Sequence, residues 1–244
     1  MGSGNRVGVE LDDTCGAYDK LHSLDNRLML QWYPQRVMRL AKGDSLLELG
    51  IGHGYSSVQY AKRFKRYRVI DGSSEIIKRF RRKFDVRSMD IVHAYFERYE
   101  SIEKFDNISM GFVLEHVGDP RLILKRYKKY LKPGGSVFIA VPNGESLHRR
   151  FGREAGLLGS YTITSSADRA QGHKRVFTLS TIERLVRAAG YRVRSIEGIF
   201  LKPVSTQQLT DLDLSADILQ AMLKVGVHYP ELSNGILLHA KAAS

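Results

Sequence analysis

The segment Ser45–Gly54 reads SLLELGIGHG and decides the fold of this 244-residue chain. Its first five residues form a short, mostly apolar run of the kind that a buried strand needs. Gly50, Gly52 and Gly54 follow at alternate positions, and such glycines let the backbone turn sharply and let a ligand lie directly against it. A dinucleotide-binding turn, G-x-G-x-x-G, would need glycine where Tyr55 stands, so that fingerprint is absent.

An acidic residue, Asp71, ends the next predicted strand, Tyr67–Ile70. An acid at this place can accept hydrogen bonds from both hydroxyl groups of a ribose. The glycine turn and Asp71 together predict a site for an adenosine-containing cofactor.

Short apolar or β-branched runs alternate with helical patterns between Gly43 and Asn143, which predicts βαβ units around a parallel sheet. Ser73 or Ser74 is expected to cap the helix that follows Asp71, whose buried stripe is Ile76, Ile77, Phe80 and Phe84. The later strands are predicted at Ile91–Ala94, Phe105–Phe112, Ser136–Val141, Arg192–Leu201 and Gly235–Ala242.

The helices are expected to follow the same alternation. The helical stretches are Ser56–Phe64, Pro120–Leu131, a helix capped by Ser180 or Thr181 that ends at Ala189, and an amphipathic helix within Gln207–Val225.

We expect one domain with four parts. Residues 1–42 form an N-terminal helical cap, 43–143 the cofactor-binding core, 144–178 a lid or substrate-binding insertion, and 179–244 a C-terminal helix, strands and helical cap. The third part is irregular and rich in glycine, and loops of this length in compact domains are usually functional.

Composition narrows the class of protein. The chain has 38 Lys and Arg against 26 Asp and Glu, a net charge of +12, and a single cysteine, Cys15. It therefore has no internal disulfide, and no Cys/His cluster has zinc-finger spacing. No apolar run approaches the roughly 18 to 20 residues of a membrane-spanning helix, and Met1–Asp12 lacks the apolar core of a signal peptide. We expect a cytoplasmic protein without membrane contact.

Three basic runs, Lys62–Arg66, Lys78–Lys83 and Lys125–Lys129, fall on predicted helices. Their apolar members have helical core spacing, so the charges are expected to form a solvated face. Docking of an acidic carrier protein or of nucleic acid is the alternative.

Four motifs in order carry a family resemblance. The chain resembles class I S-adenosylmethionine-dependent methyltransferases, particularly the ubiquinone-biosynthesis-like small-molecule branch. The motifs are Glu48-x-Gly50-x-Gly52-x-Gly54, Val69-Ile70-Asp71-Gly72-Ser73, Leu114-Glu115-His116-Val117 and Leu131-Lys132-Pro133-Gly134-Gly135. We accordingly expect an α/β, Rossmann-like, seven-stranded, mostly parallel sheet with helices on both faces. One insertion of helix and loop follows strand 5, and a helical insertion lies between the last two strands.

The resemblance implies S-adenosyl-L-methionine as cofactor and S-adenosyl-L-homocysteine as product. It implies that Gly50, Gly52 and Gly54 line the methionine moiety and that Asp71 holds the ribose. Glu48 would lie behind the loop near the amino group, and Tyr18 would close over the cofactor.

The residues expected to contact the adenine differ from those of the family. Many members place an Asp-Ala pair after the third strand, whereas this chain has Tyr95 at the acidic position. Phe96 packing on the adenine and Glu97 accepting from its amino group are therefore hypotheses, and ordinary strand-end residues are the alternative.

The chain also differs from some relatives in a motif that can bind a divalent metal ion. Some relatives have Glu-x-x-Glu-His after the fourth strand, and here Phe112 replaces the first carboxylate of that set. Glu115 and His116 alone are too few for a dedicated magnesium site. We therefore predict that the protein does not require a metal ion.

Methyl transfer from a sulfonium is an in-line displacement, so the protein must align the acceptor and exclude water. A positioned base assists when the acceptor is a hydroxyl or a protonated amine. His173 is our first candidate and His148 the second, while His116 is expected to be structural or adjacent to the cofactor.

Four cations fall near the same predicted face: Arg149, Arg150, Arg175 and Lys202. They could hold a carboxylate or phosphate on the acceptor through charge-assisted hydrogen bonds.

The predicted function is metal-independent methyl transfer to an oxygen or nitrogen of a small metabolite, such as a natural product or saccharide precursor. The acceptor would be anionic or carrier-bound, and the protein a monomer or homodimer. An RNA or DNA methyltransferase is one alternative, but Gly111–Leu114 stands where base aminomethylases carry an Asn- or Asp-Pro-Pro motif. A non-catalytic cofactor-binding regulator is the other. Nucleic acid is not the expected partner.

Overall fold

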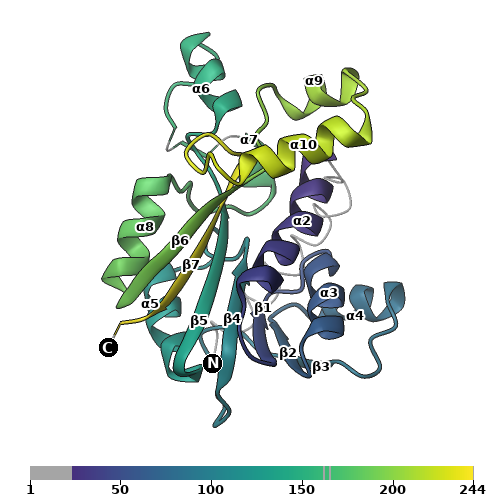
Figure 1. Ribbon diagram of the computed structural model, residues 1–244, viewed down its shortest axis with the longest axis vertical. Helices are drawn as coiled ribbons and strands as arrows, with labels where there is room; N and C mark the ends of the chain where they lie inside the picture. Colours follow the sequence, from purple (N-terminus) through teal and green to yellow (C-terminus); the bar gives the residue numbers. More distant parts are fainter. Residues whose placement is uncertain (1–23, 162, 165, 244) are drawn as a thin grey trace, which may run out of the picture.

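Seven strands form one mixed sheet in the order β3-β2-β1-β4-β5-β7-β6 (Figure 1). The computed structural model describes residues 24–161, 163–164 and 166–243. The strands are β1 Ser45–Leu49, β2 Arg66–Asp71, β3 Asp90–His93, β4 Phe105–Gly111, β5 Leu131–Pro142, β6 Tyr191–Ile199 and β7 Gly235–Ala242. The first five pair in parallel, whereas β7 runs antiparallel to β5 and β6. The predicted Rossmann-like sheet is confirmed.

The central strand β1 has every residue buried and is hydrogen-bonded to β2 on one edge and β4 on the other. Leu46 packs in the core on one face, and Leu47 and Leu49 pack in the core on the opposite face. A strand covered on both faces reads as a continuous apolar run, which is why Ser45–Leu49 does not alternate.

Helices cover both faces of the sheet (Figure 1). Residues of α5 and α8 contribute to one core, and residues of α2, α3 and α4 contribute to the other, which also holds single residues from α9 and α10. The helix bounds are α2 Leu24–Leu40, α3 Tyr55–Arg63, α4 Ser74–Lys83, α5 Pro120–Tyr127, α6 Leu147–Glu154, α7 Ser166–Ala170, α8 Leu179–Ala188, α9 Thr206–Asp211 and α10 Ala216–Gly226.

Two predicted helices differ from the structure. The helix expected up to Leu131 ends as α5 at Tyr127 and is followed by a 3-10 turn, Lys128–Tyr130. The amphipathic helix expected within Gln207–Val225 is two helices, because Asp213 adopts a φ of 43° and Ser215 starts a new N-cap. A periodic apolar pattern can continue across such a break, so the sequence alone did not reveal it.

Helix caps were predicted to within a few residues. Ser73, one of the two candidates for α4, accepts a hydrogen bond from the Ile76 N–H at 3.1 Å. The cap of α8 is Thr178, and the prediction of Ser180 or Thr181 was wrong. Thr178 has an extended backbone, and its hydroxyl and that of Thr181 satisfy each other's N–H groups.

The insertion after β5 carries α6 and α7 and projects beyond the end of the sheet (Figure 1). Its base is held by Asn143, whose side-chain amide donates to the carbonyls of Pro230, Glu231 and Ser233. The Gly144 N–H donates to the Phe177 carbonyl at 2.7 Å. The start of the insertion is therefore tied to the segment that precedes β7 and to the end of the insertion itself.

The basic runs lie mainly at the surface, with Phe64, Phe80 and Tyr127 buried between the charges. This arrangement agrees with a solvated face. Among the described residues, no helix combines the length and apolar character that crossing a membrane would require.

The cap assignment is testable by denaturation. Thr178→Ala is expected to lower the free energy of unfolding by about 1 kcal/mol, because an orphan N–H of α8 loses its acceptor. Ser180→Ala, at an exposed neighbouring hydroxyl, should change it by less than about 0.5 kcal/mol. Equal losses in the two variants would place the cap elsewhere.

Candidate functional site

A cavity of about 850 Å³ lies at the carboxyl ends of the parallel strands. It is lined by the loops that follow β1, β2, β3 and β4 and by parts of the insertion after β5. Binding pockets for small molecules and cofactors are roughly 300–1,000 Å³, so this one is large. In open α/β sheets ligands bind at this edge, where the strand order reverses beside the central strand.

The three glycines of the loop after β1 have different structural roles. All have positive φ, at 79° for Gly50, 51° for Gly52 and 80° for Gly54. A Cβ on Gly54 would lie 2.5 Å from the Phe80 ring, so this glycine allows close packing. A Cβ on Gly52 would meet nothing within 4 Å, so Gly52 leaves its part of the cavity open to a ligand.

Asp71 lies beside this loop with its carboxylate held by the backbone. One oxygen accepts from the Ile51 N–H at 2.8 Å, and the other accepts from the Ser73 N–H at 2.9 Å. A carboxylate oxygen can accept more than one hydrogen bond, so these contacts orient Asp71 and leave capacity for hydroxyl donors. Asp71 lines the cavity, as a ribose-binding residue must.

Glu48 lies behind the loop, where it accepts hydrogen bonds from the Ser57 hydroxyl at 2.7 Å and from the Tyr67 hydroxyl. Burial raises the pKa of its carboxyl to about 7. Glu48 is not among the residues that line the cavity. The structure thus joins it to Ser57 and Tyr67 beneath the turn.

The candidate adenine contacts, Phe96 and Glu97, both line the cavity. Phe96 lies close to Gly50, since its ring would be 3.8 Å from a Cβ there. The candidate Tyr18 lies outside the described residues.

Two aromatic residues of the cavity were missed as site residues by sequence reasoning. Tyr33 of α2 and Phe112 after β4 pack edge to face with ring centroids 5.5 Å apart, and both line the cavity. Phe112 has a φ of 56°, a strained conformation for a non-glycine residue that often marks functional sites. Gly111 was the sequence signal that could have indicated this packing. A Cβ at that position would overlap the Tyr33 ring, so glycine is needed there.

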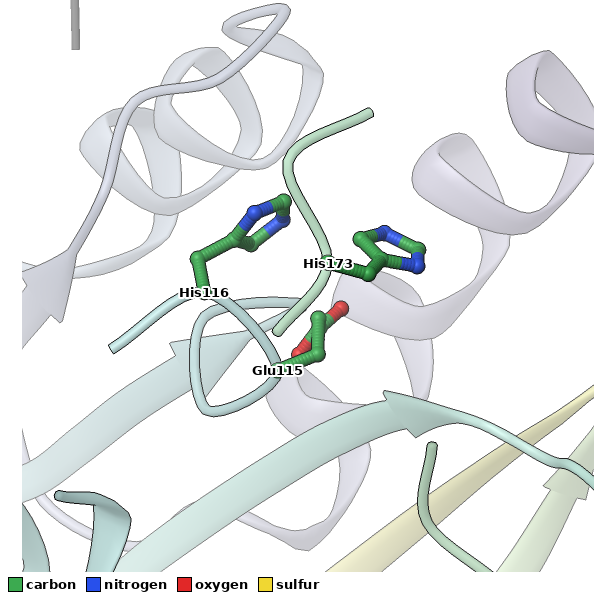
Figure 2. A group of neighbouring side chains, drawn as sticks. All are labelled: Glu115, His116 and His173. Atoms are coloured by element: carbon green, nitrogen blue, oxygen red, sulfur yellow. The ribbon is translucent and has the colours of Figure 1, made fainter. Parts of the chain in front are cut away.

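His173 lies beside the loop that follows β4, near Glu115 and His116 (Figure 2). One ligand atom of each of the three side chains falls within 4.8 Å of the others. Asp168 also contacts His173, with 3.3 Å between Asp168 Oδ1 and His173 Nδ1. The prediction of no metal considered only the neighbours of Glu115 in sequence, and the tertiary structure adds His173 to that pair.

Burial and electrostatics differ within this group. Glu115 is 1% exposed, and burial raises the pKa of its carboxyl to about 7. Burial, together with His173, lowers the pKa of His116 to about 4, so its imidazole is neutral at physiological pH.

His148, the second candidate base, lies on α6 and lines another part of the cavity. Its Nδ1 lies 3.1 Å from the Ser146 hydroxyl. Burial, with the cations Lys202 and Arg149, lowers its pKa to about 3. A base this weak accepts protons poorly near neutral pH.

The four candidate cations do not form one anion clamp. Arg149, Arg175 and Lys202 line the cavity, and Arg150 does not. The Lys202 ammonium is buried and lies 2.8 Å from the Asp25 carboxylate. Arg150 Nε donates to the Glu145 carbonyl at 2.7 Å.

The remaining two guanidinium groups hold the insertion in place. Arg149 donates to the carbonyls of Gly144, Tyr161 and Ile163. Arg175 donates to Leu114 and Gly118 at 3.0 and 2.9 Å and also to Val117.

Backbone contacts complete this connection, because the Lys174 N–H donates to the Glu115 carbonyl at 2.9 Å. The contacts of Lys174 and Arg175 therefore fix His173, their neighbour in the chain, beside Glu115.

Known proteins resemble the chain in both sequence and fold. A family model described as "Methyltransferase domain" matches residues 21–196. The ubiquinone biosynthesis O-methyltransferase of Aeromonas salmonicida is 26% identical over 202 residues, which cover 80% of this chain and 82% of that protein. The (S)-coclaurine N-methyltransferase of Papaver somniferum is 26% identical over 140 residues, covering 54% of this chain and 40% of that protein.

A solved structure gives the same architecture. The 1,6-didemethyltoxoflavin-N1-methyltransferase of Burkholderia thailandensis, with bound 1,6-didemethyltoxoflavin and S-adenosylhomocysteine, aligns with a TM-score of 0.63 and 15% identity. The alignment covers 100% of this chain and 92% of that one. At this identity the likeness shows the fold alone.

The buried Glu48 generates a pH prediction. Its pKa is about 7 in the folded protein against 4.5 ordinarily, so the folded state keeps a proton that the unfolded chain loses. The stability from this residue is fully present below the unfolded pKa and is lost as pH rises through the folded one. Glutamine at this position stays neutral at every pH. The free energy of unfolding of Glu48→Gln should therefore rise by about 1 to 3 kcal/mol relative to that of the wild type as pH increases from about 5 to about 8.

Chemical denaturation across that pH range measures the difference. Glu154→Gln, at an exposed glutamate, is the matched control and should follow wild type. A Glu48→Gln curve parallel to wild type would show that Glu48 ionises normally in the folded protein.

Proposed function

We propose that this protein methylates an oxygen or nitrogen of a small molecule. The chain belongs to the methyltransferase domain family and is a class I S-adenosylmethionine-dependent methyltransferase. The observation that carries this proposal is the shared cavity. It joins the glycine turn and Asp71 to the pair formed by Asp168 and His173. A cofactor site and a candidate base thus open into one space.

The residues of the first loops fit S-adenosylmethionine. Gly52 leaves open space beside the backbone, and the oriented Asp71 carboxylate can accept from ribose hydroxyls. Phe96 and Glu97 line the neighbouring wall and suit a base ring with an exocyclic amine. When bound, the cofactor supplies a methyl group on a positively charged sulfur.

We assign His173 as the general base. The Asp168 carboxylate favours the tautomer with the proton on Nδ1, which leaves the Nε2 lone pair to take the proton of a hydroxyl or amine. The insertion that carries His173 is bound to the β4 loop through Lys174 and Arg175, which supports exclusion of water from the cavity. This step uses no metal.

The charge of the acceptor stays a prediction. Arg149, Arg175 and Lys202 favour an anionic group by lining the cavity. However, acidic and basic described side chains line it in equal numbers, and these cations already bind carbonyls or a carboxylate. We therefore propose a neutral hydroxyl or amine compound as the first acceptor class to screen.

The alternatives receive less support. The basic runs of α3, α4 and α5 do not line the cavity, so they offer no path that leads a nucleic acid to it. A regulator without catalysis would not need the pair of Asp168 and His173 beside the cofactor site. A cytoplasmic location and a monomer or homodimer stay predictions.

The cofactor assignment is testable by calorimetry. Asp71→Ala should weaken S-adenosylhomocysteine binding by about 1.5 to 3 kcal/mol, because hydrogen bonds to a charged group are lost. Asp85→Ala, at an exposed acid on the surface, should bind as wild type does. Unchanged affinity in Asp71→Ala would remove Asp71 from the site, and thermal unfolding shows whether the variant is folded.

The base assignment is testable by kinetics once an acceptor is found by screening methyl transfer from labelled cofactor. His173→Gln should lower kcat by about 10²- to 10⁴-fold with little change in cofactor affinity. His148→Gln should have a much smaller effect on kcat, since its weakly basic imidazole is not assigned to proton transfer. Full activity of His173→Gln would contradict the assignment.

A further inference from the structure

Beyond the proposed methyl transfer, we propose that Glu115, His116 and His173 form a binding site for a divalent transition-metal ion of the zinc class. The three side chains come from two segments, the loop after β4 and the end of the insertion (Figure 2). No single stretch of sequence contains the set.

The geometry suits three ligands of one ion. One ligand atom from each side chain lies within 4.8 Å of the others, and the two imidazole ring centroids are 4.9 Å apart at 74°. Ligand atoms around tetrahedral zinc lie about 3.3 Å apart, given bonds of about 2.0–2.2 Å. Binding therefore requires only a small inward movement of the side chains.

Glu115 supplies an independent observation. It is 1% exposed, and within the described part of the chain neither carboxylate oxygen has a hydrogen-bond partner outside its own residue. A buried carboxylate normally binds donors or cations, because its desolvation is otherwise uncompensated. A metal ion held with His116 and His173 would compensate it.

His173 has an outer partner, as metal-binding histidines usually do. Asp168 Oδ1 lies 3.3 Å from Nδ1 of His173, which leaves Nε2 of that ring for the ion. All three side chains line the cavity, so the fourth coordination position would face the space where a water or ligand can bind.

The donor set selects the class of ion. Two imidazoles and one carboxylate suit zinc, cobalt, nickel or ferrous iron. Magnesium prefers oxygen ligands in octahedral geometry, so this set disfavours it.

One consequence rests on the proposed function. An ion bound to Nε2 of His173 occupies the lone pair that would otherwise take the proton of the acceptor. Metal loading and the action of His173 as a base therefore exclude each other, and zinc is expected to inhibit methyl transfer.

The experiment uses the full chain without a histidine tag. Chelator-treated protein is titrated with Co²⁺, whose visible absorption reports tetrahedral coordination, and Zn²⁺ affinity is measured by competition with a chelating dye. We expect one ion per chain. Glu115→Gln, His116→Ala and His173→Ala should each weaken binding by more than the roughly 10–100-fold that loss of an outer partner costs, and Asp168→Asn should show the smaller loss.

His228→Ala is the matched control, because it removes an exposed imidazole outside the cavity and should bind the ion as wild type does. Glu115→Gln also distinguishes loss of the metal site from loss of the fold. It relieves the buried charge, so without metal it should melt at or above the wild-type temperature and yet lose the stabilisation that Zn²⁺ gives wild type.

Wild-type protein that fails to bind Co²⁺ or Zn²⁺, or folded variants that bind like wild type, would overturn the site. This failure is distinguishable from failure of the proposed function, because metal binding is measured without an acceptor. Equal methyl transfer by zinc-loaded and chelated enzyme, with binding established, would reject His173 as the base and leave the metal site standing.

Discussion

The site depends on one constraint, the parallel pairing of the buried strand β1 with β2 on one edge and β4 on the other. Parallel neighbours deliver their carboxyl ends to the same edge of the sheet. The Gly50–Gly54 turn follows β1, Asp71 ends β2 and Glu115 lies after β4, so all three are brought to one cavity. The backbone bonds from Ile51 and Ser73 to the Asp71 carboxylate then lock two of the loops together.

The insertion after β5 completes that cavity by binding back to the β4 loop. Arg175 satisfies carbonyls of the loop, and the Lys174 N–H binds the Glu115 carbonyl. These bonds hold the end of the insertion against the β4 loop and place His173 beside Glu115 and His116. Arg149, Arg175 and Lys202, which the sequence suggested for substrate, line the cavity and also bind protein carbonyls or a carboxylate.

Features set by neighbours in sequence were predictable. The strands, the glycine turn and the Ser73 cap follow from local apolar patterns and turn chemistry. The cap of α8 was misplaced because Thr178, Ser180 and Thr181 all carry hydroxyls and only the backbone conformation distinguishes them. The break between α9 and α10 was missed because the apolar pattern continues through Asp213.

The sequence by itself determined the α/β sheet, the glycine turn with Asp71 near it, and the candidate residues, because these depend on patterns within about one strand or helix. Only the tertiary structure decided which candidates lie together. It paired Lys202 with Asp25, separated Arg150 from the cavity, and brought His173 to Glu115 and His116. Such contacts join distant segments, and they depend on strand order and on where an insertion binds back, which no local pattern specifies.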